Sequence, residues 1–223
     1  MNLHKFWLVR HALVHPGHMN HLYGTNDVPI CDDTMAAQTG RYAALAARLP
    51  RPARFVCTPL SRTQITAEAI FRAGYPAQIP LLDPAFVEQN FGDLQGQPIT
   101  DFANRADDER HPFWPIHALE VPPGGESFAD LIARVGAGLE ALLTTATGRH
   151  TIIVSHGGAI RAACAHALGL TPHQALCLQI DNISLTKLEH SEQGWRVLSV
   201  NEHLSTIACE SAALGQVSPA TAA

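Results

Sequence analysis

The sequence has little charge and no excess of basic residues. Only 16% of its 223 residues are charged, and the formal net charge is -5. Nucleic acids and anionic membranes are bound through clustered lysine and arginine side chains, so this composition argues against both kinds of partner. Any anion that the protein binds must therefore be held by a small, focused group of cationic side chains.

The sequence also lacks cysteine pairs and long apolar runs. Its five cysteines are scattered along the chain without a C-x-x-C pair, which argues against a cysteine-based zinc or redox site and favours a reducing compartment. No stretch approaches the ~20 apolar residues of a membrane span, and the N-terminal apolar run is too short for a signal peptide. We therefore expect a cytoplasmic protein.

Short apolar runs recur along the chain and are typical of buried β-strands. We predict strands at residues 5–9, 54–58 and 150–155, and near 78–82, 176–180, 184–189 and 195–200. Helical patterns separate the first strands, and such alternation is typical of an α/β fold. With 46% hydrophobic content, we expect one domain over residues 1–210 and a disordered tail at 211–223.

Helices are predicted where apolar periodicity follows a capping residue. Three such segments are residues 32–49, 61–73 and 126–143. Residues 95–125, in contrast, are rich in proline, glycine, histidine and charge and show little periodicity. Loops of this length in compact domains are usually functional or disordered. We therefore predict an irregular cap or lid over a site.

A histidine-rich segment, LVRHALVHPGHMNH, occupies residues 8–21 and contains His11, His15, His18 and His21. Imidazole is a common metal ligand, so a metal site has to be considered first. The guanidinium of Arg10 beside His11 raises the electrostatic cost of a divalent cation, and no carboxylate follows until Asp27. We therefore predict no metal here and one histidine with a chemical role, with a histidine-rich metal carrier as an alternative.

Polar side chains follow three of the predicted strands. Arg10 and His11 follow the first strand and Arg62 the second, and His156 follows the most apolar strand. In open α/β sheets the ligand-binding groups gather at the carboxyl ends of the strands. Arginine side chains, and backbone amides at a helix start beyond Gly157, bind phosphate oxygens well. The sequence therefore predicts a phosphate site at this edge of the sheet.

The same residues suggest nucleophilic catalysis. A neutral imidazole at His11 can attack a phosphate ester, and a covalent phosphohistidine divides one difficult transfer into two easier ones. We expect Arg10, Arg62 and a protonated His156 to supply positive charge, and Glu88, in a loop before the cap, to protonate the leaving oxygen. A neutral nucleophile beside a charged histidine predicts a bell-shaped pH profile.

Six segments, in order along nearly the whole chain, match motifs of one known family. They are LVRHA at 8–12, YGTNDVPI at 23–30, TPLSRTQITAEAI at 58–70, EQNFGDLQG at 88–96, PPGGES at 122–127 and VSHGG at 154–158. Together they resemble the motifs of the histidine phosphatase superfamily, also called the phosphoglycerate mutase-like family. An isolated R-H dipeptide is common, whereas six matches in order are specific.

The resemblance implies a fold and a set of residue roles. The fold would be a three-layer α/β/α sandwich with a mostly parallel central sheet. His11 would be the phosphorylated nucleophile and Glu88 the proton donor and then acceptor, without a metal or an organic cofactor. The residues that would hold the phosphoryl group are Arg10, Arg62 and His156, with the amide of Gly157. From the second segment we expect Tyr23, Gly24 and Thr25 to line the substrate site.

Two departures from the family pattern bear on activity. Gly17 stands where many members carry an asparagine, so a phosphate donor is either lost or replaced by Asn20 or Thr25. Leu94-Gln95 stands in place of a W-E pair and changes what supports the Glu88 loop.

The chain also lacks the long substrate-recognition insertion associated with the mutases, so we expect a phosphatase acting on a small phosphorylated metabolite. The size and the Y-G-x-x-D-V-P segment resemble the α-ribazole phosphatase-like branch. A mutase-type phosphotransferase and a non-catalytic phospho-ligand binder remain alternatives. The final apolar strands provide an edge that could support a homodimer.

Overall fold

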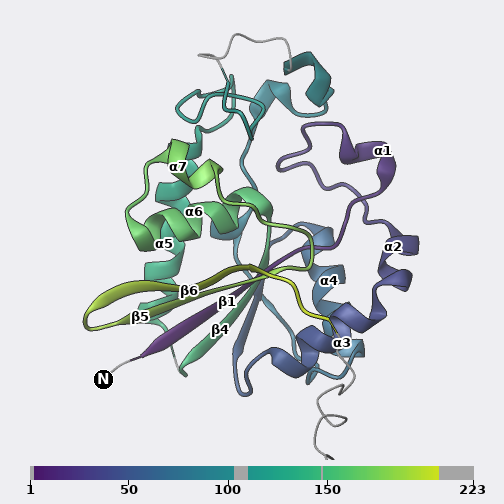
Figure 1. Ribbon diagram of the computed structural model, residues 1–223, viewed down its shortest axis with the longest axis vertical. Coiled ribbons are helices and arrows are strands. Elements are labelled where there is room, and N and C mark those ends of the chain that lie inside the picture. Colours follow the sequence, from purple (N-terminus) through teal and green to yellow (C-terminus); the bar gives the residue numbers. More distant parts are fainter. Residues whose placement is uncertain (1–2, 103–109, 147, 206–223) are drawn as a thin grey trace, which may run out of the picture.

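The computed structural model contains a six-stranded β-sheet (Figure 1). Its strands are β1 (His4–Arg10), β2 (Arg54–Cys57), β3 (Leu81–Leu82), β4 (His150–Ser155), β5 (Leu185–Ser191) and β6 (Gly194–Glu202). In the order β3-β2-β4-β1-β5-β6, the first four strands pair in parallel, and β5 pairs antiparallel with both β1 and β6. The predicted mostly parallel sheet is therefore confirmed.

Helices cover both faces of the sheet (Figure 1). The structure describes residues 3–102, 110–146 and 148–205. The α-helices in these ranges are α1 (Pro16–Met19), α2 (Asp32–Ala37), α3 (Thr39–Arg48), α4 (Ser61–Arg72), α5 (Phe128–Thr144), α6 (Gly157–Leu168) and α7 (Pro172–Leu176). Short 3-10 helices are η1 (Pro84–Phe86), η2 (Gly92–Leu94) and η3 (Ile99–Phe102).

Strand β1 shows how the sequence divides its apolar side chains between two cores. Phe6 and Leu8 pack into a cluster with α5 and α6, whereas Trp7 and Val9 pack into a second cluster with α3 and α4. Successive side chains of a strand point to opposite faces, so a fully apolar run is expected only where both faces are covered. The predicted three-layer α/β/α sandwich is confirmed.

Helix α5 confirms the helix predicted at 126–143. Ser127 and Asp130 form a reciprocal capping box that satisfies the first backbone N–H groups. Leu131, Val135 and Leu139 recur at helical spacing and are buried against the sheet and α6.

The helix predicted at 32–49 is interrupted. Its two parts are α2 and α3, and Gln38 between them has a non-helical backbone with φ -105° and ψ 20°. Thr39 and Gly40, which follow, have low helix propensity, and this favours a break at that point.

The strand predicted near 176–180 is wrong, because α7 occupies the start of that segment. Thr171 and Gln174 form a capping box, and Pro172 stands in the first turn. These start signals outweigh the short apolar run. The strands predicted near 184–189 and 195–200 are confirmed as β5 and β6, and the one near 78–82 is reduced to β3.

The described part of the 95–125 segment lies beyond the carboxyl ends of β1 and β4, with α1 nearby (Figure 1). Residues 103–109 of this segment and the tail predicted at 211–223 lie outside the described residues. No helix in the described part of the chain is long and apolar enough to cross a membrane.

Replacing Leu139 by alanine should lower the free energy of unfolding by about 2–5 kcal/mol, because alanine leaves a cavity at a side chain that is 0% exposed. Urea titration followed by circular dichroism measures this change. Leu119→Ala is the matched control, since Leu119 is 61% exposed, and its effect should stay below about 0.5 kcal/mol. Equal losses in both variants would contradict the placement of Leu139 in the core.

Candidate active site

The parallel pairing of β1 with β4 brings two histidines together. Arg10 is in register with Ser155, so the next residues, His11 and His156, lie side by side at the carboxyl ends of the two strands. Their ring centroids are 5.1 Å apart, and both side chains are buried. The backbone N–H of His11 donates to the Ser155 carbonyl at 2.9 Å, which extends the strand pairing into the site.

The ring of His11 is held in one tautomer. Its Nδ1 lies 2.6 Å from the carbonyl oxygen of Ala12. A carbonyl only accepts hydrogen bonds, so Nδ1 carries the proton and Nε2 keeps a free lone pair. Burial, followed by the charges of Arg62 and Arg10, holds the pKa of His11 well below its usual range. The ring is therefore neutral and nucleophilic at neutral pH.

The ring of His156 has the opposite tautomer. Arg62 Nε donates to His156 Nδ1 at 3.2 Å, and His156 Nε2 lies 3.0 Å from Thr58 Oγ1. Burial, the Arg62 charge and His11 hold the pKa of His156 well below its usual range. The prediction of a protonated His156 is wrong, because a guanidinium can only donate and so needs a bare nitrogen opposite it. The positive charge of the site comes from its arginines.

The guanidinium of Arg62 is fully buried and fixed by three acceptors. Besides His156, its NH1 donates to the carbonyl of Asn26 at 2.8 Å and its NH2 to that of Gly24 at 2.7 Å. The aromatic ring of Tyr23 lies under the guanidinium, with its centroid 5.2 Å away. Since a guanidinium has about five N–H donors, Arg62 is positioned by the protein and keeps donors for an anion.

Asp27 lies beside this arginine. Its Oδ1 is 4.0 Å from Arg62 NH1 and accepts hydrogen bonds from Ser61 N at 2.9 Å and Ser61 Oγ at 2.8 Å. Ser61 is the first residue of α4, and the Asp27 carboxylate, from a distant loop, caps the helix.

Arg10 and Gly157 form the other side of the anion site. Arg10 NH1 donates to the Ile180 carbonyl at 2.5 Å, whereas its Nε is buried with no hydrogen-bond partner among the described residues. A Cβ at position 157 would lie 3.3 Å from this guanidinium. Glycine therefore leaves the space in which a phosphate oxygen can approach both the arginine and the start of α6.

The carboxylate of Glu88 is held by two backbone N–H groups. Oε2 accepts from Gly158 N and Oε1 from Gln89 N, each at 2.9 Å. A Cβ at position 158 would overlap this carboxylate, so glycine is required for its approach. Arg134 stabilises the loop that carries Glu88, because it donates to the backbone carbonyls of Val87 at 3.1 Å and Glu88 at 3.3 Å. The Glu88 carboxylate, the predicted acid-base group, is thus held in one position at the site.

These groups line a cavity of about 220 Å³. Arg10, Glu88 and Gly157 lie on its wall, with Tyr23 and Gly24 at the side. The 95–125 segment, called the cap segment below after its predicted role, contributes Ile99, Trp114 and Pro115. The predicted site residues His11, Arg62 and His156 are buried and contact one another. The residues predicted from the strand ends therefore come together in one site.

Comparison with known proteins identifies the family. The model of the histidine phosphatase superfamily (branch 1) matches residues 6–203. The chain belongs to this superfamily. A probable phosphoglycerate mutase of Yersinia enterocolitica is 31% identical over 197 residues, covering 86% of this chain and 87% of that protein. One of Yersinia pestis is 27% identical over 193 residues with the same coverage. The predicted enzyme class, a histidine phosphatase, is confirmed.

Solved structures share the fold. A mycobacterial glucosyl-3-phosphoglycerate phosphatase superposes with a TM-score of 0.73 at 23% identity, covering 90% of this chain and 99% of that one. A putative alpha-ribazole-5'-P phosphatase from Escherichia coli gives a TM-score of 0.72 at 18% identity, covering 92% and 98%. At these identities the likeness establishes the phosphoglycerate mutase-like architecture alone.

Arg161 is a residue of this histidine phosphatase that the sequence reasoning missed. It follows Gly157 by four positions on α6, a spacing that places both on one helix face. Its Nε donates to the Leu178 carbonyl at 2.6 Å, and its guanidinium lies 5.3 Å from the centroid of a Trp114 ring. Burial lowers the pKa of Arg161 to about 10, which leaves it cationic at neutral pH. It lines the cavity beside Glu88.

The departures from the family pattern have structural consequences. Gly17 is exposed on α1, where its N–H donates to His15 Nδ1 at 3.2 Å. Gln95 Oε1 accepts from Thr25 N and Thr25 Oγ1, each at 2.7 Å. Tyr23 and Gly24 line the cavity as predicted, whereas Thr25 does not, because its hydroxyl and N–H are bonded to Gln95. Gln95 thereby connects the loop that carries Glu88 with the 23–26 loop. Leu94 packs beside the small core under the cap.

The four histidines of the opening segment have separate places. His11 is the buried ring described above, His21 lines the cavity, His15 caps α1, and His18 lies on α1. Among the described residues, His15, His18 and His21 do not bring three metal-ligating atoms together.

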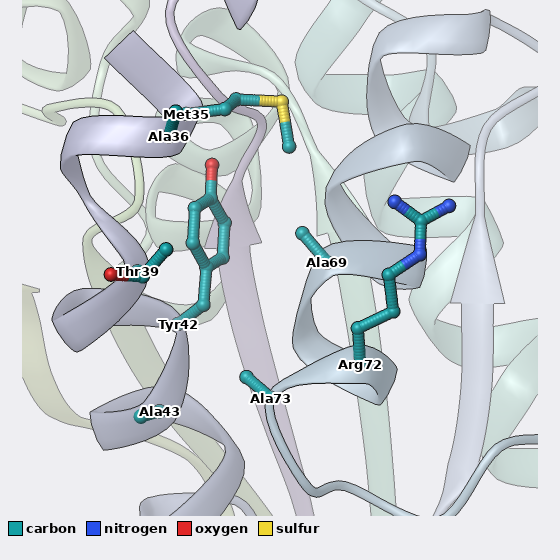
Figure 2. A pocket seen from close by; sticks show the side chains of 8 residues that line it. All are labelled: Met35, Ala36, Thr39, Tyr42, Ala43, Ala69, Arg72 and Ala73. Atoms are coloured by element: carbon teal, nitrogen blue, oxygen red, sulfur yellow. The ribbon is translucent and has the colours of Figure 1, made fainter. Parts of the chain in front are cut away.

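A second cavity, of about 390 Å³, lies between α3 and α4 (Figure 2). Its wall consists of Met35, Ala36, Thr39, Tyr42, Ala43, Ala69, Arg72 and Ala73. This lining contains no carboxylate or imidazole, so the cavity is larger than the phosphate site but has no acid-base chemistry. The Tyr42 hydroxyl is buried there without a hydrogen-bond partner among the described residues.

Gly158→Ala should lower turnover by about 10²–10⁴-fold, because the new methyl group displaces the Glu88 carboxylate and removes the positioned acid-base group. Gly148→Ala is the matched control, since a Cβ there meets nothing within 4 Å. Steady-state kinetics with an aryl phosphate and thermal unfolding should be measured for both. Unchanged turnover in a folded Gly158→Ala protein would refute the placement of Glu88.

The His11 ring should remain neutral, with its proton on Nδ1, throughout pH 6–8. Arg10→Gln should raise the pKa of His11 toward its usual value, because a neighbouring cation that disfavours protonation is removed. Two-dimensional ¹⁵N NMR of the ring nitrogens measures both the tautomer and the pKa. Arg196→Gln, at a side chain that is 68% exposed, should leave the titration unchanged. A ring protonated at pH 6.5 in the natural protein contradicts this assignment.

Proposed function

We propose that the protein is a metal-independent phosphatase that hydrolyses a small phosphate monoester through a phosphohistidine on His11. The single observation that carries this proposal is the 2.6 Å bond from His11 Nδ1 to the Ala12 carbonyl, which leaves Nε2 as a free nucleophile. The arginines beside the ring support the same reaction, because they attract a phosphate dianion and, after burial, are the next causes that keep the imidazole neutral.

In the first step, His11 Nε2 attacks phosphorus and forms the P–N bond as the P–O bond to the leaving group breaks. The electron pair of that bond goes to the leaving oxygen, which takes a proton from Glu88 in its acid form. Arg10 Nε, the free donors of Arg62 and the amide of Gly157 stabilise the charge on the equatorial oxygens. His156 acts as a positioning residue, since its Nδ1 orients Arg62.

In the second step, water attacks the phosphohistidine while the Glu88 carboxylate accepts its proton. The P–N bond breaks, its electron pair returns to Nε2, and inorganic phosphate leaves. Glu88 ends in its acid form, ready for the next ester. The net reaction is ester plus water to alcohol plus phosphate.

The cavity favours a small phosphorylated metabolite as substrate. Its volume of about 220 Å³ suits a compact ester, and Arg161 beside Trp114 offers a cation and an aromatic face to the leaving group. A cytoplasmic location belongs to the same proposal, supported by four free cysteines in the described residues. A homodimer, and the lack of nucleic-acid and membrane partners, stay predictions from the sequence.

A mutase-type phosphotransferase is the second candidate. It is favoured by the curated relatives, which carry the name of probable phosphoglycerate mutases. A mutase would return the phosphoryl group from His11 to another hydroxyl of the same product, so it would isomerise a phosphoglycerate without net phosphate release. A phosphatase would release phosphate at each turnover.

His11→Ala should lower phosphate release from an aryl phosphate in the presence of a chelator by about 10³-fold or more, because the nucleophile is lost. His15→Ala, in the same segment but exposed, should retain full activity. Rapid quenching of the natural protein should trap an acid-labile, alkali-stable phosphoprotein that the His11→Ala protein does not form.

The outcomes separate the candidates. Chelator-resistant turnover that survives in His11→Ala overturns the phosphohistidine route. Isomerisation of a phosphoglycerate without free phosphate establishes the mutase instead. Binding of phosphate esters by the natural protein, with neither turnover nor phosphoprotein, identifies a phospho-ligand binder.

A further inference from the structure

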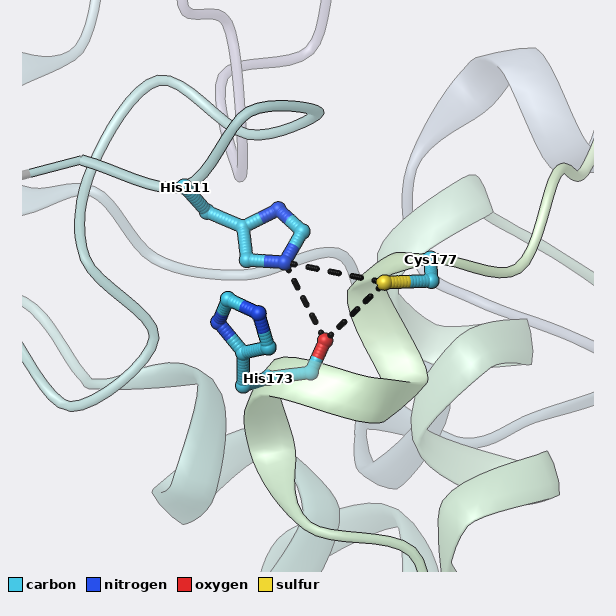
Figure 3. A group of neighbouring side chains, drawn as sticks. All are labelled: His111, His173 and Cys177. Atoms are coloured by element: carbon cyan, nitrogen blue, oxygen red, sulfur yellow. Dashed lines mark hydrogen bonds between the residues drawn. The ribbon is translucent and has the colours of Figure 1, made fainter. Parts of the chain in front are cut away.

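We propose that His111, His173 and Cys177 form a second site, which binds a zinc-like transition-metal ion outside the phosphatase cavity (Figure 3). One ligand atom from each residue can be chosen so that all three lie within 4.8 Å of one another. Among the described residues this is the one group of three metal-ligating side chains with such spacing.

The fold places these ligands by two independent constraints. His173 and Cys177 are four residues apart at α7, so one helical turn puts them on the same face. The capping box that starts α7 fixes the position of that turn. His111 comes from the cap segment, where its backbone N–H donates to the Ile116 carbonyl at 3.3 Å. The site therefore joins the cap to α7.

The distances are close to those of a tetrahedral centre. His111 Nε2 lies 3.9 Å from Cys177 Sγ, and the rings of His111 and His173 are 4.2 Å apart between centroids. Zinc takes nitrogen at about 2.0 Å and sulfur at about 2.3 Å, which separates two tetrahedral ligands by about 3.6 Å. A small movement of exposed side chains thus closes the site. His111 is 1% exposed and supplies the fixed ligand.

The donor set selects the class of metal. Two imidazoles and a thiolate suit zinc and its analogue cobalt(II), whereas magnesium and calcium require oxygen ligands. No carboxylate belongs to this group. His173 and Cys177 are exposed, so the fourth coordination position faces solvent and can take water.

Metal binding has a defined proton balance. His111 Nδ1 accepts from Phe113 N at 3.1 Å, and its Nε2 therefore carries the proton, which it donates to the His173 carbonyl at 3.1 Å. Ligation through Nε2 moves this proton to Nδ1 and ends the bond to Phe113, while the Cys177 thiol releases its proton to solvent. The bound metal thereby alters the turn that leads to Trp114 at the cavity wall.

Cobalt(II) titration of the full-length, reduced protein tests the site. We expect about one equivalent to bind with a thiolate-to-cobalt charge-transfer band and the visible spectrum of a tetrahedral centre, both removed by added zinc. Cys177→Ala should lose the charge-transfer band, and His173→Ala should weaken cobalt binding by at least about tenfold. Both side chains are exposed, so these variants should fold. His18→Ala, on α1, is the matched histidine control.

Each other outcome overturns the site. A charge-transfer band that persists in Cys177→Ala assigns the thiolate elsewhere, and loss of binding in His18→Ala assigns the metal to the N-terminal histidines. No tetrahedral spectrum in the natural protein at millimolar cobalt likewise excludes the site. The readout is spectroscopic and needs no turnover, so it is independent of the proposed phosphatase reaction.

Discussion

The buried guanidinium of Arg62 is the group on which the rest of the site depends. It donates to His156 Nδ1 and to the carbonyls of Gly24 and Asn26, so it fixes one tautomer and one loop at once. Together with burial, which is the larger cause, its charge holds the pKa of the His11 ring below its usual range. Burial of a cation costs free energy unless the cation is hydrogen-bonded. The three acceptors supply these bonds to Arg62, and a bound anion would accept the remaining ones.

The sheet supplies the geometry in which this cation acts. Parallel pairing of β1 and β4 brings His11 and His156 to one edge, and the start of α6 follows directly. Glu88 arrives from a separate loop and is accepted only because position 158 is glycine. The position of His11 is thus set by strand register, and that of the Glu88 carboxylate by a close backbone approach.

Much of the fold and the nucleophile side of the site could be predicted from local patterns. Helix α5 has both periodicity and a capping box, and the strand ends identify Arg10, His11 and His156. The charge of His156 could not be predicted, because it depends on a donor 94 residues away in sequence. Arg161 was missed for a related reason: the i+4 spacing from Gly157 has meaning only once α6 is placed against the cap.

The hydrogen bonds from Thr25 to Gln95 connect the loop that orients Arg62 with the loop that carries Glu88. The two loops therefore form one stiff rim along that side of the cavity. Trp114 is tied to the same rim, because its Nε1 donates to Gln89 Oε1 at 2.9 Å. A displacement of either loop would therefore be passed on to Arg62, to Glu88 and to the aromatic wall of the cavity together.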